Sequence, residues 1–303
     1  MANSNVKIKI TIVVGVALAA ALGVTLLAVA EQAPPSADYF SAALHTQEGG
    51  CGGSIEVRYE VVPTTTKIPS GSLDQGADKP MLVNAATGVH YIRTSSRQFA
   101  EEVLSIDGKE VYRKKHSYDR NTGQSITFQQ PAGDAVGSAV IGEGRGFFGG
   151  AVMLDPVLTC WSEQPLADLC ARGSVKGDME QVDDRPCYRI DVAPVQGYVE
   201  SHSVWLDPSI GFCPRRVAVL RADGSERVRT SFLDYRLAGE AVWFPWRVVI
   251  VCRDADGSVW NTADYRVSEL NLGKTFADNE LGVTIPPGTR VSVRGSGVAF
   301  TQP

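Results

Sequence analysis

Alternation between apolar and polar residues is the dominant pattern after the first fifty residues of the chain. The stretch Ile55–Val61 (IEVRYEV) alternates strictly, with Glu56, Arg58 and Glu60 at the polar positions. Successive side chains of a β-strand point to opposite faces. The pattern therefore predicts a strand with one buried face and one solvated face that carries these three charges.

Three Asp-Gly dipeptides, at 107–108, 223–224 and 256–257, punctuate the strand-like stretches. Such dipeptides are typical of tight hairpins, because the type I′ turn needs a positive φ at both central residues. A two-residue loop at each site fixes the expected register. The predicted cross-strand pairs are Glu102–Arg113, Glu101–Lys114, Phe99–His116, Arg221–Glu226, Val219–Val228, Arg253–Trp260 and Val248–Tyr265. Complementary pairs in each hairpin indicate an antiparallel meander.

One strand and one helix stand out from this meander. Val242–Cys252 is apolar at nearly every position, which predicts a central strand covered on both faces. Ala37–Gln47 is predicted as a short helix capped by Ser36, with Phe40 and Leu44 on one face at i, i+4 spacing. Together these patterns predict a mainly β domain with an N-terminal helix.

A glycine-rich stretch and an apolar segment interrupt the strands in the middle of the chain. Gly137–Gly150 is expected to be a loop, and Ala151–Trp161 a helix of one or two turns limited by Pro156. The apolar residues of this region form the candidate ligand-binding group. They are Phe147, Phe148, Met153, Leu154, Val157, Leu158 and Trp161. Two interpretations stay open: core that plugs one end of the sheet, or a mobile lid over an apolar cavity.

The N-terminus predicts export from the cytoplasm. Lys7 and Lys9 precede the uncharged apolar run Ile10–Ala30, and residues 31–36 form a short linker. Positive charge stays on the cytoplasmic side while such a run enters the bilayer. Ala28-Val29-Ala30 fits a cleavage site, yet the run is as long as a membrane span. Residues 1–30 are therefore either a signal peptide or an inner-membrane anchor whose N-terminus is cytoplasmic, and the protein works in the periplasm or cell envelope.

Charge and cysteine content narrow the function further. Without Lys7 and Lys9, 27 of the 29 basic residues remain against 34 acidic ones, which argues against nucleic acid as a partner. The chain has 6 cysteines, and Cys160 and Cys170 are the most plausible disulfide because they are close in sequence. Free buried thiols are an equally open interpretation for the others.

Motifs for catalysis or cofactor binding find little support. The GxGxxG stretch Gly144–Gly149 lies among hairpin strands, not in the parallel unit that a dinucleotide site needs. Ser203 and Asp207 lie near His202, but neighbours on one strand point to opposite faces, and no GxSxG motif occurs. The four histidines are not at metal-ligand spacing. We expect no enzyme activity, no cofactor and no metal.

Several stretches resemble one known family. Ser105–Tyr112 (SIDGKEVY) is similar to a hairpin of the periplasmic carriers that sort outer-membrane lipoproteins, the LolA, LolB and RseB-type superfamily. Phe276–Val291 is similar to that family's last strand and its closing segment. Further short matches are Tyr188–Ile190, Trp205–Pro208, Pro214–Arg216 and Phe244-Pro245.

The resemblance implies a fold and a function for residues 37–303. The fold is a half-open antiparallel β-barrel, a concave sheet with an N-terminal helix and a short inner helical lid. The function is non-enzymatic binding of lipid or acylated ligands, such as lipoproteins, in an apolar cavity. The family's acyl-binding arginine has no motif-based match, although Arg58 lies on the corresponding early strand. The alternative is a membrane-anchored sensor or scaffold that uses the same fold to contact another envelope protein.

Overall fold

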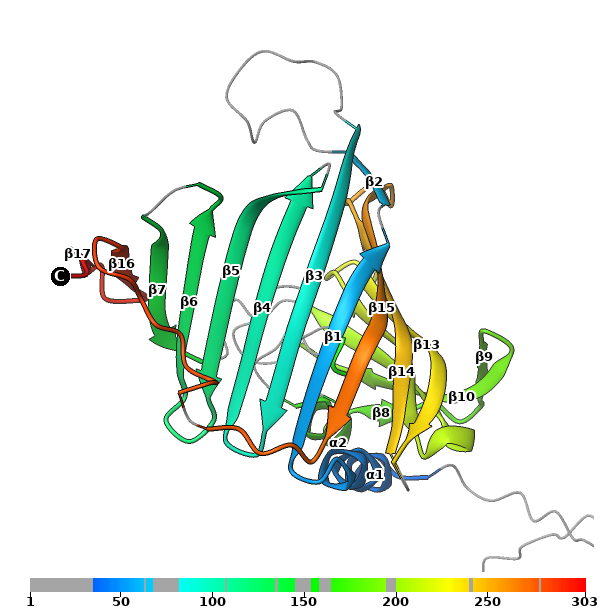
Figure 1. Ribbon diagram of the computed structural model, residues 1–303. Helices are drawn as coiled ribbons and strands as arrows, with labels where there is room; N and C mark the ends of the chain where they lie inside the picture. The colour runs from blue at the N-terminus through cyan, green and yellow to red at the C-terminus, as the bar shows by residue number, and fades with distance from the viewer. Residues whose placement is uncertain are drawn as a thin grey trace, which may run out of the picture. The chain divides into compact units, whose positions relative to one another are not determined.

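One large, open and almost entirely antiparallel sheet dominates the computed structural model (Figure 1). The structure describes residues 35–62, 64–67, 82–106, 108–133, 136–144, 154–157, 165–194, 200–239, 242–277 and 279–303. Within these ranges the sheet has 17 strands. The predicted fold class, mainly β with a concave unclosed sheet and an N-terminal helix, is confirmed.

The elements follow one another with short connections. The helices are α1 (Ala37–Gly50), α2 (Leu166–Ala171) and the 3-10 turn η2 (Pro208–Ile210). The strands of the first half are β1 (Ser54–Val62), β2 (Thr64–Lys67), β3 (Leu82–Thr94), β4 (Arg97–Ile106), β5 (Lys109–Asp119), β6 (Gln124–Pro131) and β7 (Ser138–Glu143). Those of the second half are β8 (Ser174–Val175), β9 (Glu180–Val182), β10 (Arg185–Val192), β11 (Ser201–Asp207), β12 (Cys213–Leu220), β13 (Glu226–Ala238), β14 (Val242–Arg253), β15 (Val259–Leu272), β16 (Arg290–Val293) and β17 (Ala299–Thr301).

Strand pairing places β1 at the middle of the sheet. On one side β1 pairs with β3, and the order continues β4, β5, β6, β7, β16, β17. On the other side β1 pairs with β15, and the order continues β14, β13, β12, β11, β10. In Figure 1 the strands β13–β15 turn out of the plane of β3–β7, so the sheet curves around an inner face.

The predicted N-terminal helix is confirmed as α1. The Ser36 hydroxyl accepts a hydrogen bond from the Tyr39 amide at 3.2 Å, which satisfies one free N–H of the first turn. Phe40 and Leu44 are buried, as their spacing predicts. The helix continues to Gly50. The shorter α2, which begins after Pro165, was not predicted, since six residues give too little periodicity to recognise.

The three Asp-Gly hairpins are present, and their registers differ in part from the prediction. Each hairpin carries a β-bulge next to its turn, between Leu104 and Ser105 in the first one. The bulge adds one residue to one strand. It moves the charge pairs to Glu102–Lys114 and Glu101–Lys115 and places His116 opposite Ala100 instead of Phe99. Opposite charges still face each other across the ladder.

In the other two hairpins, the pairs on the far side of the bulge agree with the prediction and those near the turn do not. Val219 pairs with Val228, and Val248 pairs with Tyr265, as expected. Glu226 faces Leu220 instead of Arg221, and Arg253 faces Val259 instead of Trp260.

Part of the predicted loop Gly137–Gly150 is a strand. Ser138–Glu143 forms β7, which is antiparallel to β6 and parallel to β16. Ladder hydrogen bonds on both edges, together with burial of Ala139, outweigh the low strand propensity of the glycines. The predicted helix Ala151–Trp161 lies mostly outside the described residues, and Leu154–Val157 within it forms a turn.

Two apolar cores lie on opposite faces of the sheet. On the inner face, the helices pack against β1, β3 and β10–β15 through Phe40, Leu44, Leu166, Leu169 and their neighbours. On the outer face, the segment that leads from β15 to β16 covers β3–β7. The residues of this smaller core are Ile92, Phe99, Phe128, Ala139, Leu281, Val283 and Val291. The C-terminal segment therefore covers part of the outer face of β3–β7.

The described cysteines are buried. Cys51, Cys187, Cys213 and Cys252 are free thiols. Burial raises the pKa of Cys187 and of Cys213 to about 12, so both thiols are protonated at neutral pH. The predicted Cys160–Cys170 disulfide stays a prediction, because Cys160 lies outside the described residues.

The predicted signal peptide or anchor, residues 1–30, also lies outside the described residues. Among the helices that the structure does describe, none has the length and apolar character needed to span a bilayer.

Gly173 gives a direct test of the packing between α2 and β10. A Cβ at this position meets Ile190 Cγ2 at less than a normal contact distance and Val192 Cγ2 at 3.2 Å. We expect Gly173→Ala to lower the free energy of unfolding by about 1–3 kcal/mol, the usual cost of overpacking. Urea unfolding measures the effect. Gly177→Ala is the matched control, since no described atom lies within 4 Å of a Cβ there; equal losses in both variants contradict the packing.

Candidate functional site

A four-residue segment, Leu154–Val157, lies against the inner face of the sheet, and we call it the strap. It belongs to the region predicted as plug or lid. Leu154 is 0 % exposed and Val157 is 7 % exposed, and both belong to the inner core. The strap therefore fills the apolar concavity of the sheet with two aliphatic side chains.

Asp155 clamps the strap to the sheet. Its Oδ2 accepts hydrogen bonds from Arg93 Nε at 2.7 Å and from the Tyr91 hydroxyl at 3.1 Å, both on β3. The side chains of Arg93 and Asp155 are 4 % and 1 % exposed, so this is a buried ion pair, and we call it the clamp. Breaking a buried pair by removing one partner typically costs about 3–5 kcal/mol.

Backbone hydrogen bonds hold the strap on either side of Asp155. The Tyr59 hydroxyl of β1 donates to the Leu154 carbonyl at 3.1 Å, and the Val157 amide donates to Asp155 Oδ1 at 3.1 Å. The Val157 carbonyl accepts from the Leu166 amide at 3.2 Å, which links the strap to the start of α2. The strap is thus bonded to the inner face through Leu154 and Asp155, to the start of α2 through Val157, and within itself between Val157 and Asp155.

Arg93 also connects the clamp to α1. Its Nη1 lies 3.6 Å from Glu48 Oε1 near the end of the helix, and Glu48 also pairs with Arg120 at 3.1 Å. The Cys51 thiol, whose pKa is raised by burial, lies 3.9 Å from Arg93 Nη2. The Arg93 guanidinium therefore contacts both the strap and α1. A displacement of either one changes the ion pair that Arg93 forms with the other.

Arg93 keeps its charge across the physiological pH range. Burial disfavours the charged form of Arg93, but the charge of Asp155 outweighs it and raises the Arg93 pKa. Burial, and after it the charge of Asp155, raises the pKa of Tyr59 well above its ordinary value.

The structure places two of the predicted lid residues on the inner face, Leu154 and Val157. The other five, Phe147, Phe148, Met153, Leu158 and Trp161, lie outside the described residues. Arg58, the candidate for the family's arginine, is half exposed and pairs with Glu269 at 3.2 Å. Its position on the outer face separates it from the strap.

Sequence reasoning missed the clamp residues. A signal existed for both charges. Asp155 is a lone acid within an apolar segment, and Arg93 is the next position in the period-two series that begins with the apolar Val89 and Tyr91. A charge at an apolar position of a strand or plug needs a partner inside the protein.

The serine and histidine residues weighed for hydrolysis form no catalytic arrangement. Ser203 Oγ donates to Asp191 at 2.7 Å, whereas Asp207 binds Arg215 at 2.8 Å. Burial lowers the pKa of His202, whose two ring nitrogens have no partner among the described residues. Among all the residues that the structure describes, no group of three potential metal ligands comes together.

Comparison with known proteins shows the fold. No protein-family model and no curated protein matches the chain. Among solved structures, a lipoprotein-sorting domain from Vibrio parahaemolyticus aligns at 10 % identity with a TM-score of 0.51, covering 81 % of this chain and 97 % of that one. A DUF1329 family protein from Desulfovibrio piger aligns at 11 % identity with a TM-score of 0.52, covering 81 % and 96 %. The chain has a LolA-like fold, as the sequence resemblance predicted.

Proposed function

We propose that this domain is a non-enzymatic binding protein for lipid or acylated ligands, including lipoproteins, and that it works outside the cytoplasm. One observation carries the proposal: a short strap buries two aliphatic side chains against the inner face and is held there by a single buried clamp. A segment that only fills the core needs no buried ion pair, which is seldom more stabilising than apolar packing.

An acyl chain can compete with the strap on energetic grounds. Burial of a methylene contributes about 0.8 kcal/mol, so roughly a dozen methylenes of a C14–C16 chain contribute about 10 kcal/mol. The buried pair opposes release of the strap by about 3–5 kcal/mol. Release of the strap also exposes Leu154 and Val157, at about 1.5–3 kcal/mol each. The two sides are of similar size, so a sufficiently long acyl chain displaces the strap and a short one does not, with selectivity set by chain volume.

The predicted export segment and the LolA-like fold support a place in the periplasm or cell envelope. If residues 1–30 are retained, the domain is tethered to the inner membrane. If they are removed, it is free to carry a ligand across the periplasm.

Native mass spectrometry of the exported protein, purified without detergent, tests the proposal. We expect a co-purified lipid or acylated peptide, or uptake of an offered phospholipid. The same spectrum shows whether residues 1–30 are present, and counts disulfides at about 2 Da each, including the predicted Cys160–Cys170 bond. The proposal is contradicted if the purified protein has the mass of the ligand-free chain and keeps that mass after phospholipid is added.

The alternative function is a membrane-anchored sensor or scaffold that contacts another envelope protein. One observation favours it: β17 lies at an end of the strand order and exposes Phe300 to 43 %. An exposed edge strand can pair with a strand from a partner. A ligand-free spectrum together with a retained anchor would support this function.

A further inference from the structure

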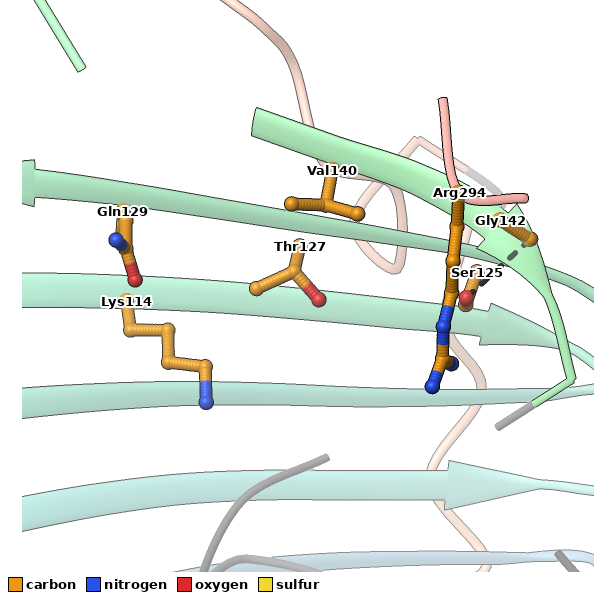
Figure 2. Close-up of a pocket in the computed structure, with 7 residues that line it drawn as sticks. All are labelled: Lys114, Ser125, Thr127, Gln129, Val140, Gly142 and Arg294. Atoms are coloured by element: carbon orange, nitrogen blue, oxygen red, sulfur yellow. Dashed lines mark hydrogen bonds between the residues drawn. The ribbon is translucent and has the colours of Figure 1, made fainter. Parts of the chain in front are cut away.

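A second feature of the inner face is a hollow at the far side of the sheet, over β5, β6 and β7. Its volume is about 340 Å³. Figure 2 shows the residues that line it, which are Lys114, Ser125, Thr127, Gln129, Val140, Gly142 and Arg294. The volume is at the small end of the range for ligand pockets, which suits a headgroup and not a whole lipid.

Strand register places the hollow on the same face as the strap. Tyr91 of β3 pairs with Ala100, Ala100 with His116, and His116 with Thr127 of the hollow. Directly paired residues share a face of the sheet. Three strand spacings separate Tyr91 from Thr127, about 14 Å at about 4.8 Å per strand. One amphiphile can therefore reach from beneath the strap to the hollow.

The lining of the hollow is cationic. Lys114 and Arg294 contribute its charges, and none of the described residues that line it is acidic. The nearest acid by register is Glu102, opposite Lys114, and among the described residues no carboxylate lies within 4 Å of the Lys114 amine. On the outer face of the same strand, by contrast, Arg113 and Lys115 both pair with Glu101.

The fold positions Arg294 over the sheet. Its amide donates to the Ile141 carbonyl at 2.8 Å at the end of β16. A Cβ on Gly142 would lie 2.9 Å from Arg294 Cβ, so the glycine leaves the space that the arginine side chain occupies. Figure 2 shows the guanidinium extending across the neighbouring strands on the same side of the sheet as the Lys114 amine.

A buried amide lies between the strap and the hollow. Gln98 is 0 % exposed, and neither its Nε2 nor its Oε1 has a hydrogen-bond partner in the described structure. It pairs with Arg93 on one side and with Tyr118 on the other. A buried amide without partners costs about 1–3 kcal/mol and calls for an explanation. A ligand with polar groups along this path supplies the missing partners.

We propose that the hollow binds the phosphate of an anionic lipid whose acyl chain lies on the inner face in place of the strap. Lys114 and Arg294 contact the phosphate, and Gln98 contacts the ester or hydroxyl groups between phosphate and chain. This inference rests on the proposed function and specifies the ligand class. Charge-assisted hydrogen bonds to phosphate are the strongest that such side chains make.

Calorimetric titration with two amphiphiles of equal chain length tests the inference. One is myristoyl lysophosphatidylglycerol and the other is uncharged monomyristoylglycerol, both below their micelle concentrations. We expect the phosphate-bearing lipid to bind about 10- to 100-fold more tightly to the wild type. In the double variant Lys114→Gln with Arg294→Gln, the preference falls below about threefold while monomyristoylglycerol binds as before.

The control double variant Arg113→Gln with Lys115→Gln removes the same charge from the outer face and keeps the preference. The inference is overturned, and acyl binding left intact, if the wild type binds the two amphiphiles with equal affinity. The same holds if the Lys114 and Arg294 variant keeps the preference for the phosphate-bearing lipid. Binding of glycerol 3-phosphate alone with comparable affinity overturns it in favour of a free-phosphate site. Binding of neither amphiphile overturns the proposed function and this inference together.

Discussion

Asp155→Asn is expected to raise the affinity for an acyl probe by about 10- to 100-fold and to lower the stability of the closed state. Asparagine keeps the shape of the side chain and leaves the buried Arg93 without its main counter-charge. Glu48, 3.6 Å from Arg93, compensates only in part. A loss of about 3 kcal/mol from the closed state lowers the ratio of closed to open protein about a hundredfold. Because apparent affinity scales with the fraction of competent protein, a more open strap binds ligand more tightly.

A fluorescent fatty-acid titration and urea unfolding measure the two effects. Asp207→Asn is the matched control, because Asp207 is 1 % exposed and pairs with Arg215 at 2.8 Å. Its hydrogen bonds go to Arg215 and Ser209, not to the strap. We expect the control to lose stability without a gain in probe affinity. Equal affinities in the two variants, or lost binding in Asp155→Asn, contradict the role of the clamp.

Glu56→Gln is expected to cost about 3 kcal/mol of stability at pH 7. The Glu56 side chain is 5 % exposed and forms hydrogen bonds with His90 at 2.9 Å, Asn271 at 3.1 Å and Lys274 at 2.9 Å. These partners lie on β3, on β15 and just after β15. One carboxylate therefore joins the two strands that flank β1 to the start of the C-terminal segment.

The effect depends on pH in a defined direction. Burial opposes the charged form of Glu56, but the bonds from Lys274, His90 and Asn271 outweigh it and lower its pKa from 4.5 to about 2. A pKa that is lower in the folded state stabilises the protein above pH 4.5, and this contribution is lost as the pH falls through 2. At about 1.4 kcal/mol per pKa unit, the contribution is about 3 kcal/mol.

Urea unfolding at pH 7 and at pH 3 checks this expectation. The difference in the free energy of unfolding between the wild type and Glu56→Gln should be smaller at pH 3 than at pH 7. Glu269→Gln is the control, because its pair with Arg58 is half exposed and such pairs contribute at most about 1 kcal/mol. A difference in the free energy of unfolding that is the same at both pH values means that Glu56 contributes by packing and not by its charge.

Period-two alternation and turn chemistry predicted the fold because both are local. The alternation in Ile55–Val61 identified β1, and each Asp-Gly dipeptide marked a hairpin. The bulges next to the turns were not predictable, since their positions depend on how the twisted strands pack. For this reason the first register is shifted by one residue while the positions of the hairpins are right.

The site was less accessible to sequence reasoning because its contacts are distant along the chain. Arg93 and Asp155 are 62 residues apart. Glu56 was predicted on a solvated face, and this was wrong: its partners Asn271 and Lys274 lie 215 and 218 residues away and cover it. An alternating pattern tells which residues share a face, but not what the rest of the chain places on top of them.

Hydrogen exchange at the strap tests the central claim that an acyl ligand displaces it. The Val157 amide is held by Asp155 Oδ1 and the Leu166 amide by the Val157 carbonyl, so both are protected in the ligand-free protein. On saturation with a myristoyl lipid we predict faster exchange at these amides and slower exchange in the strands of the inner face. A protein that binds the lipid while both amides keep their full protection would contradict displacement of the strap.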